Sequence, residues 1–196
     1  MILPTERRKI EKHNPKLIVL YGKPKSGKSS IMAALDNNLI MDLEDGYRAL
    51  SVMSIDLKKV ADFFEAEKAL KEKMAADGKK PYKYITIDNA TRLEEMSISY
   101  ANHLYRTTTP MGASWGLKKD SKGNSVPDPS ADVRLLPNGA GWLYVRKAVR
   151  KLVELFVPYC ETLILVAHVK DKQIRKDGEE MSEMSVDLAK FYWSAA

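Results

Sequence analysis

The sequence predicts a single α/β domain, a three-layer sandwich in which helices cover both faces of a mostly parallel central sheet. Two observations lead to this fold class. Short apolar runs, partly β-branched, alternate along the chain with longer segments whose apolar residues recur at helical spacing. Continuous runs of this kind are typical of strands buried on both faces. The alternation implies right-handed crossovers, which set the strands parallel and place helices over the sheet.

The expected strands are short and apolar. The first is the run LIVLY at residues 17–21, and the others span residues 39–43, 51–55, 84–88 and 162–167. The polar segment 170–186 is expected to form a hairpin or loop. It should turn at Asp177-Gly178, because such a pair favours a tight turn.

Four helices are expected between these strands. They cover residues 29–35, 57–76, a segment that includes Leu93 and Leu104, and 141–157. The second is the most regular, because its apolar residues recur at helical spacing among lysines and glutamates. By contrast, residues 107–140 show no periodicity and contain scattered glycines and prolines. So long an irregular stretch inside a compact domain indicates a functional or mobile loop.

The composition bounds the class of protein. The 196 residues suit one domain, and no apolar run approaches the ~20 residues that a membrane span needs. The N-terminus carries charges without the apolar stretch of a secretion signal, and the lone Cys160 can form no internal disulfide, so we expect a cytoplasmic protein. Cys160 is expected to be a small buried residue at a helix–strand junction. The net charge of +6 mildly favours an acidic partner such as nucleic acid.

One motif carries chemistry directly. The segment Gly22-Lys23-Pro24-Lys25-Ser26-Gly27-Lys28-Ser29 matches the phosphate-binding pattern G-x-x-x-x-G-K-[ST] in full. The backbone of such a loop wraps around phosphate oxygens with its N–H groups inward, and a Cβ at the glycines would obstruct that approach. Lys28 is expected to neutralise the β- and γ-phosphates of ATP, and the Ser29 hydroxyl to join a Mg²⁺ shell, with Ser30 beside them.

Polar residues also follow three expected strands. Asp88 ends the strand KYITID, where an acid can orient magnesium and its waters; a cap of the next helix is the alternative. Glu44 is the best candidate to polarise an attacking water, with Asp42 and Asp45 as rivals and a solvated acidic turn as the alternative. His168 either faces the nucleotide or is a satisfied histidine at a strand end.

In order along the chain, YGKPKSGKSS, LIMDLEDG, YITIDNATRL and LILVAHVKD resemble the RecA-like recombinase core in its compact phage form. The resemblance implies a RecA-like P-loop NTPase core that uses ATP and Mg²⁺, in the host cytoplasm if the chain is phage-encoded. In that family the second strand ends in Asp-x-Glu, whose Glu positions the hydrolytic water; the matching residue is Glu44. The γ-phosphate sensor of the family matches His168.

The resemblance also implies partners. The stretch 107–140 lies where the family carries its first DNA-binding loop, and the polar hairpin where it carries the second. The candidate contacts with single-stranded DNA are Trp115, Lys118, Lys119, Lys122, Arg134, Lys170, Lys172 and Arg175. Trp115 either stacks on a base or anchors its loop, and the second loop either touches DNA or reaches a neighbouring subunit's ATP. Lys190 and Phe191 match a Lys-Phe pair at the family's subunit interface, so a homo-oligomeric filament or ring is expected.

The expected organisation is an N-terminal arm, residues 1–15, and a RecA-like ATPase core, residues 16–196, with the insertion at 107–140. The expected function is that of a DNA-stimulated ATPase that acts on single-stranded DNA in phage-type recombination or annealing, away from membranes. One alternative is an interaction module that ATP clamps with little hydrolysis. A small P-loop kinase is the other, and the Asp-x-Glu strand end argues against it.

Overall fold

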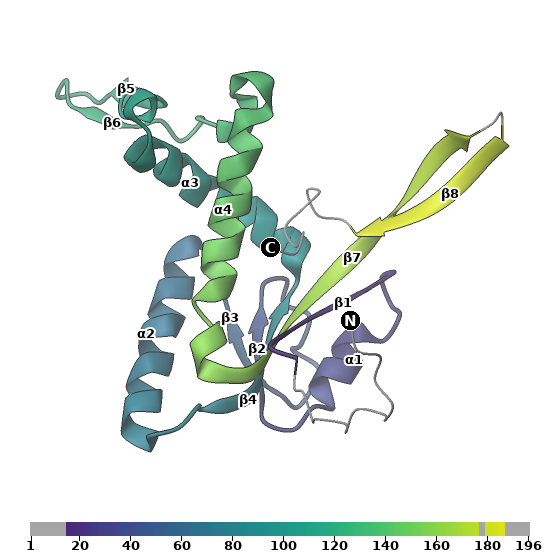
Figure 1. The fold of residues 1–196 in the computed structure, drawn as a ribbon. Coiled ribbons are helices and arrows are strands. Elements are labelled where there is room, and N and C mark those ends of the chain that lie inside the picture. The colour runs from purple at the N-terminus through teal and green to yellow at the C-terminus, as the bar shows by residue number, and fades with distance from the viewer. Residues whose placement is uncertain (1–14, 177–178, 187–196) are drawn as a thin grey trace, which may run out of the picture.

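The computed structural model describes residues 15–176 and 179–186, and from residue 170 onward it describes the backbone alone. In these residues five parallel strands form the central sheet, and a sixth, β8, pairs antiparallel with β7 (Figure 1). The parallel strands lie in the order β1 (Leu17–Gly22), β7 (Cys160–Lys176), β4 (Tyr82–Asp88), β2 (Asn38–Asp42) and β3 (Met53–Asp56). The predicted parallel α/β fold is therefore confirmed.

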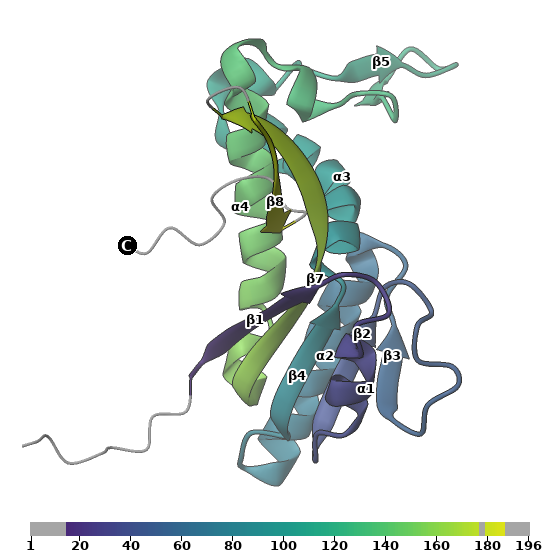
Figure 2. The ribbon, with the colours of Figure 1, turned by 90° about the vertical axis from the view of Figure 1, so that its right-hand side faces the viewer.

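Helices cover both faces of the sheet, as predicted (Figures 1 and 2). On one face, α2 (Val60–Asp77), α3 (Ala90–Thr108) and α4 (Ala140–Glu154) contribute to the larger core cluster, which includes Phe63, Leu93 and Phe156. On the other face, α1 (Lys28–Ala33) contributes Met32 to a smaller cluster. Alternate residues of the strands supply the two clusters, because successive side chains of a strand point to opposite faces.

Several boundaries differ from the predicted ones for local reasons. α2 begins at Val60 rather than Leu57, because the Asp62 carboxylate accepts the backbone N–H groups of Lys58 at 2.7 Å and Lys59 at 2.9 Å and so caps the helix there. α4 ends at Glu154, and the short 3-10 helix η4 (Val157–Tyr159) follows it. Pro158 lies in that short helix and cannot donate the backbone bond that would continue α4. The predicted buried Cys160 is confirmed at the start of β7.

The prediction that the first strand is buried on both faces is wrong for the described residues. Ile18 is 37% exposed and Tyr21 is 59% exposed. The physical reason is position, because β1 lies at the end of the described strand order whereas β7, β4 and β2 lie inside it. A continuous apolar run can therefore mark an edge strand as well as an inner one.

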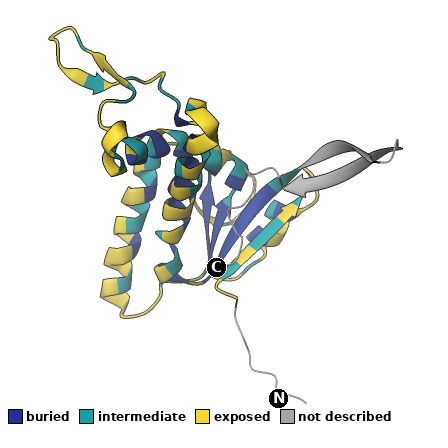
Figure 3. Cartoon of the chain, turned by 45° about the horizontal axis from the view of Figure 1, so that its top comes forward, coloured by how far each residue is buried: buried dark blue, intermediate teal, exposed yellow. Residues whose placement is uncertain are grey.

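The prediction that residues 107–140 lack regular structure is also wrong in part. They contain the end of α3, the 3-10 helices η1 (Pro110–Gly112), η2 (Val133–Leu135) and η3 (Pro137–Gly139), and a hairpin of β5 (Leu117–Lys119) and β6 (Ser125–Pro127). The hairpin turns where Asp120 accepts the backbone N–H groups of Lys122 and Asn124 and Gly123 adopts a φ of 81°. Figure 3 shows this hairpin as a mostly exposed extension.

A buried side chain fastens this segment to the helical layer. Asn102 of α3 donates to the carbonyl of Ala131 at 2.6 Å and accepts the N–H of Val133 at 2.8 Å. Val133 is fully buried in a third cluster with Ala101 and Val145. The segment is thus anchored to α3 and α4 at its C-terminal part.

The pairing of β7 with β8 confirms the polar hairpin predicted for residues 170–186, whereas the predicted turn at Asp177-Gly178 lies outside the described residues. β7 continues past the sheet to Lys176, and β8 (Glu179–Val186) runs back beside it with Lys176 opposite Glu179. Figure 1 shows the two strands projecting from the sheet as a ribbon. In the described residues no helix is long and apolar enough to cross a membrane.

We predict that Gly141→Ala destabilises the junction between η2 and α4. A Cβ at Gly141 would overlap the carbonyl oxygen of the buried Val133, so the two segments would have to separate. The free energy of unfolding, measured by urea denaturation, should fall by about 1–3 kcal/mol. Gly46→Ala is the matched control, because a Cβ there meets no atom within 4 Å. Equal stability of the two variants would show that the close approach is not needed.

Candidate nucleotide-binding site

The site lies at the edge of the sheet where β1, β2 and β4 end and where β7 passes His168 before it continues into the ribbon, so the prediction that His168 ends its strand is wrong. Register places Gly22 opposite His168 and Asp42 opposite Asp88, so these residues lie along one edge of the sheet. A cavity of about 310 Å³ opens there, lined by the glycine-rich loop, the loop after β2, Asp88 and His168. Ligands of open α/β sheets bind at this edge, because the loops that leave the strands form a crevice there.

The glycine-rich loop joins β1 to α1. Gly27, just before the helix, has a φ of 86°, which glycine adopts without strain. Lys28 is only 7% exposed, and its ammonium group donates to the carbonyls of Gly22 at 2.9 Å and Lys23 at 2.8 Å, so its charge is held inside the curve of the loop. Of the predicted nucleotide-binding residues, the cavity is lined by Pro24, Lys25, Gly27, Lys28, Ser29 and Ser30. Gly22, Lys23 and Ser26 shape the loop instead, since a Lys23 carbonyl also accepts the Ser26 N–H.

The two predicted magnesium ligands lie together. The Ser29 hydroxyl donates to the Asp88 carboxylate at 3.3 Å, although the two residues lie 59 positions apart in the chain. Burial raises the pKa of Asp88, while hydrogen bonds from Tyr47 and Ser29 act to lower it and the nearby Glu44 and Asp42 charges raise it further. A hydroxyl and a carboxylate on a phosphate-binding cavity fit Mg²⁺, which binds through few protein oxygens and completes its shell with phosphates and water.

The N-terminal cap of helix α3 is the residue that follows Asp88. Asn89 is the N-cap of that helix, and its side-chain oxygen accepts the backbone N–H of Arg92 at 2.8 Å. The alternative interpretation of Asp88 as a helix cap is therefore wrong, and its carboxylate is left to the cavity.

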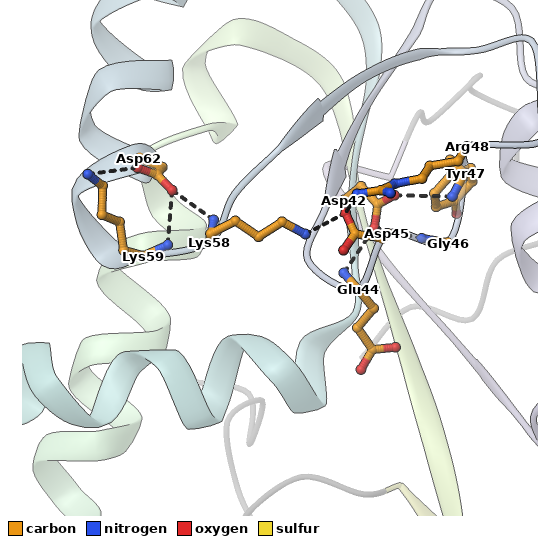
Figure 4. Close-up of polar contacts among 9 residues, drawn as sticks. All are labelled: Asp42, Glu44, Asp45, Gly46, Tyr47, Arg48, Lys58, Lys59 and Asp62. Atoms are coloured by element: carbon orange, nitrogen blue, oxygen red, sulfur yellow. Dashed lines mark hydrogen bonds and ion pairs between the residues drawn. The ribbon is translucent and has the colours of Figure 1, made fainter.

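Hydrogen bonds distinguish the three acidic residues that follow β2 (Figure 4). Asp42 is 2% exposed, and its carboxylate accepts three backbone N–H groups of the following loop, from Glu44 at 3.0 Å, Gly46 at 3.2 Å and Tyr47 at 3.1 Å. Asp45 pairs with Lys58 at 2.7 Å and Arg48 at 3.0 Å, which lowers its pKa. Both rivals are thus engaged in holding the loop.

Asp42 and Glu44 both line the cavity, but the Glu44 carboxylate accepts none of these loop N–H groups. In Figure 4 its side chain points away from the cluster of Asp45, Arg48 and Lys58. Its carboxylate lies 3.8 Å from the Nε2 of His168, and both residues line the cavity. The other ring nitrogen of His168 is buried and has no hydrogen-bond partner among the described residues.

Tyr47 is a site residue that sequence reasoning missed. Its hydroxyl donates to the Asp88 carboxylate at 2.6 Å, and the residue is 2% exposed. Burial and the neighbouring Asp88 raise the pKa of Tyr47 far above its usual range, so the phenol remains a proton donor. The sequence offered one weak signal. Tyr47 is an aromatic residue in an otherwise acidic turn, and a turn that is fully exposed to solvent does not need an aromatic side chain.

Among the predicted DNA-binding residues whose side chains are described, none lines this cavity. The Trp115 ring packs edge-to-face on Tyr105 at 5.1 Å, which supports the anchoring alternative. Arg134 forms a bidentate ion pair with Asp132, whereas Lys118, Lys119 and Lys122 are exposed on the β5–β6 hairpin. Lys170, Lys172 and Arg175 lie on the part of β7 whose backbone alone is described, and Lys190, Phe191 and most of the 1–15 arm lie outside the described residues.

The fold and this cavity define a P-loop NTPase: a glycine-rich loop between a strand and a helix, with an acid two strands away beside the loop serine. The family model described as an AAA domain matches residues 14–190, and the chain therefore belongs to that family. Nucleotide binding with ATPase chemistry is the general activity of AAA domains. No curated protein matched the chain.

We predict that Asp42→Asn destabilises the loop after β2. An amide keeps the size of the side chain but has one acceptor oxygen, so at least one of the three N–H groups, two of them part-buried and one buried, loses its partner. The free energy of unfolding should fall by about 1.5–3 kcal/mol in urea denaturation. Asp45→Asn is the control, because its exposed ion pairs should cost much less. Equal losses in the two variants would contradict the organising role of Asp42.

Proposed function

We propose that this protein is a magnesium-dependent ATPase of RecA-like type that acts on single-stranded DNA in recombination or annealing. The observation that carries the ATPase part is the meeting of Lys28, Ser29, Glu44, Asp88 and His168 at one cavity. These residues come from the segments that follow β1 and β2, from the end of β4 and from within β7, and each has the chemistry that phosphoryl transfer to water requires. The DNA part rests on the resemblance in motif order and on the exposed basic hairpin.

The proposed mechanism is positioning and charge stabilisation. The loop backbone and Lys28 hold the β- and γ-phosphates of ATP, and Lys28 exchanges its bonds to the loop carbonyls for bonds to phosphate oxygens. Ser29 and Asp88 hold Mg²⁺, which neutralises charge on the phosphates when bound. The γ-phosphate then lies toward Glu44 and His168, because the loop and these two residues line the same cavity.

Glu44 is proposed to orient the attacking water and accept its proton. Its carboxylate faces the cavity, while Asp42 and Asp45 are engaged elsewhere. His168 is proposed to sense the γ-phosphate, since an imidazole 3.8 Å from Glu44 can respond to both groups. A change in that contact would reach β7 and β8 directly, because His168 lies within β7.

A homo-oligomer is part of the proposal. Among the described residues that line the cavity, the cations are Lys25 and Lys28, both from the glycine-rich loop. Among these lining residues, no lysine or arginine therefore lies on the side of the cavity toward Glu44. We propose that a neighbouring subunit supplies the cation that stabilises the γ-phosphate there. The Lys190–Phe191 pair is proposed to lie at that interface.

Charge placement favours the β5–β6 hairpin as the first contact with DNA. Lys118, Lys119 and Lys122 are exposed there, and the Asp120 carboxylate is occupied by the turn that it stabilises. In the ribbon of β7 and β8, the register places Lys172 opposite Glu183 and Arg175 opposite Glu180. Acidic residues therefore offset the positive charge of that ribbon. We therefore propose the β5–β6 hairpin as the main site of phosphate contact, with Trp115 and Arg134 as its support.

A second candidate function is a nucleotide-clamped interaction module with little hydrolysis. The observation in its favour is the exposure of Glu44, whose side chain is 49% exposed at the rim of the cavity. A base in that position orients water poorly until another surface covers it. ATP binding would then fix an assembly without turnover.

The ATPase proposal predicts that Glu44→Gln lowers kcat by at least about a hundredfold while Mg²⁺-ATP still binds. The amide keeps the shape of the side chain but cannot accept the proton of the attacking water. Lys28→Ala should instead weaken ATP binding itself, because it removes the cation of the loop. Turnover is measured by phosphate release and binding with a fluorescent ATP analogue, each with and without single-stranded DNA.

Glu154→Gln is the matched control, since Glu154 forms a surface ion pair with Arg150 on α4. Unchanged kcat in Glu44→Gln would remove the assignment of the base. Binding of ATP without turnover in the wild type, with or without DNA, would favour the clamp over the ATPase.

The DNA proposal predicts that the triple variant Lys118→Ala, Lys119→Ala, Lys122→Ala binds a fluorescent oligothymidylate more weakly in anisotropy titrations. If each lysine contacts one phosphate, the slope of log affinity against log salt should fall by about 2. A triple variant of exposed lysines in and after α2, Lys68→Ala, Lys71→Ala, Lys79→Ala, carries the same charge change. Equal losses in both variants would mean that the hairpin has no special role.

A further inference from the structure

We propose that Tyr47 is a positioning residue for magnesium: its hydroxyl fixes the Asp88 carboxylate in the orientation that the metal shell requires. The inference rests on the proposed function and deepens it. Nothing in the phosphate-binding motif or the strand-end acids assigns this residue a role. Its three sets of contacts, with Asp88, with Asp42 and with the core, lead to the proposal.

The first contact is the hydrogen bond to Asp88. The phenol donates to Oδ2 at 2.6 Å, the length of a strong bond between a hydroxyl and a carboxylate. Ser29 donates to the same oxygen at 3.3 Å. The Oδ2 atom of Asp88 thus accepts both described hydrogen bonds. Together they fix the rotation of the carboxylate about the Cβ–Cγ bond.

The second contact holds the backbone of Tyr47. Its N–H donates to the Oδ2 of Asp42 at 3.1 Å. Asp42 and Asp88 are register partners on the neighbouring strands β2 and β4, and carboxylates in that position repel each other. Tyr47 donates to both, by its N–H to one and by its O–H to the other, so it links the two strand ends.

The third contact is packing. The Tyr47 side chain belongs to the smaller core cluster, with Met32 of α1, Ile40 of β2, and Ile164 and Val166 of β7. A buried ring in such a cluster has few alternative rotamers, so the hydroxyl has a fixed place in the cavity wall. Tyr47 is therefore held at its backbone, along its ring and at its hydroxyl.

Tyr47 also lies in the same loop as Glu44, the residue proposed to activate the attacking water. Glu44 and Tyr47 belong to the loop that Asp42 organises, and both line the cavity. Tyr47 therefore fixes the distance between the loop that carries Glu44 and the carboxylate that serves the metal. Rigid support of this kind is what holds catalytic groups within a productive geometry.

The test compares Tyr47→Phe with the wild type by titration of a fluorescent ATP analogue in EDTA and in saturating MgCl₂. Without the metal, Kd should stay within about twofold, because the ring still packs and the loop is intact. With the metal, Kd should rise about tenfold, the expected effect of one lost hydrogen bond to a charged group. The half-saturating Mg²⁺ concentration for hydrolysis should rise to the same extent.

Tyr159→Phe is the matched control. Tyr159 is also buried, at 5% exposure, and its hydroxyl bonds to Glu67 in the helical layer far from the cavity loops. That variant should keep the wild-type response to Mg²⁺. Thermal denaturation of all three proteins verifies that they are folded.

The outcomes separate the inference from the proposed function. If the wild type binds the analogue more tightly with Mg²⁺ and Tyr47→Phe does so equally, the positioning role is overturned while the ATPase proposal stands. A loss of affinity in Tyr47→Phe that is the same in EDTA also overturns it, because it indicates a packing role. If Mg²⁺ does not affect the wild type, the proposed function and the inference both fail.

Discussion

The Asp88 carboxylate, half-buried between two hydroxyl donors, is the constraint on which the nucleotide site depends. A charged group at the end of an inner strand is costly unless hydrogen bonds stabilise it. Ser29 and Tyr47 supply those bonds, one from the glycine-rich loop and one from the loop after β2. The same bonds bring the glycine-rich loop, Asp88 and the loop of Glu44 to a common place at the cavity.

The fold and the centre of the site were predictable from the sequence because their signals are local. An apolar run with a glycine-rich loop behind it identifies β1, the loop and α1 without knowledge of the rest of the chain. Asp88 and His168 could be placed at the correct edge because they end apolar runs, and parallel strands end at one edge. The exposure of Ile18 and Tyr21 could not be predicted, since strand order depends on contacts between distant segments.

Other features escaped prediction because they depend on single long-range hydrogen bonds. The insertion at 107–140 contains no periodic pattern, yet the Asn102 side chain, with its two backbone partners, fastens it to α3. The choice among Asp42, Glu44 and Asp45 required the direction of each carboxylate, which three backbone N–H groups and two cations decide. Tyr47 was missed for the same reason, because its partner lies 41 residues away.

β7 has a mechanical consequence. It is one strand of 17 residues that begins in the core, passes His168 and continues into the projecting ribbon. The eight residue steps from His168 to Lys176 span about 26 Å at the usual rise per residue. The strand is continuous from Cys160 to Lys176, so the ribbon is a lever whose fulcrum is the inner sheet. A small rotation of the strand near His168 would be carried outward along the ribbon with its displacement enlarged.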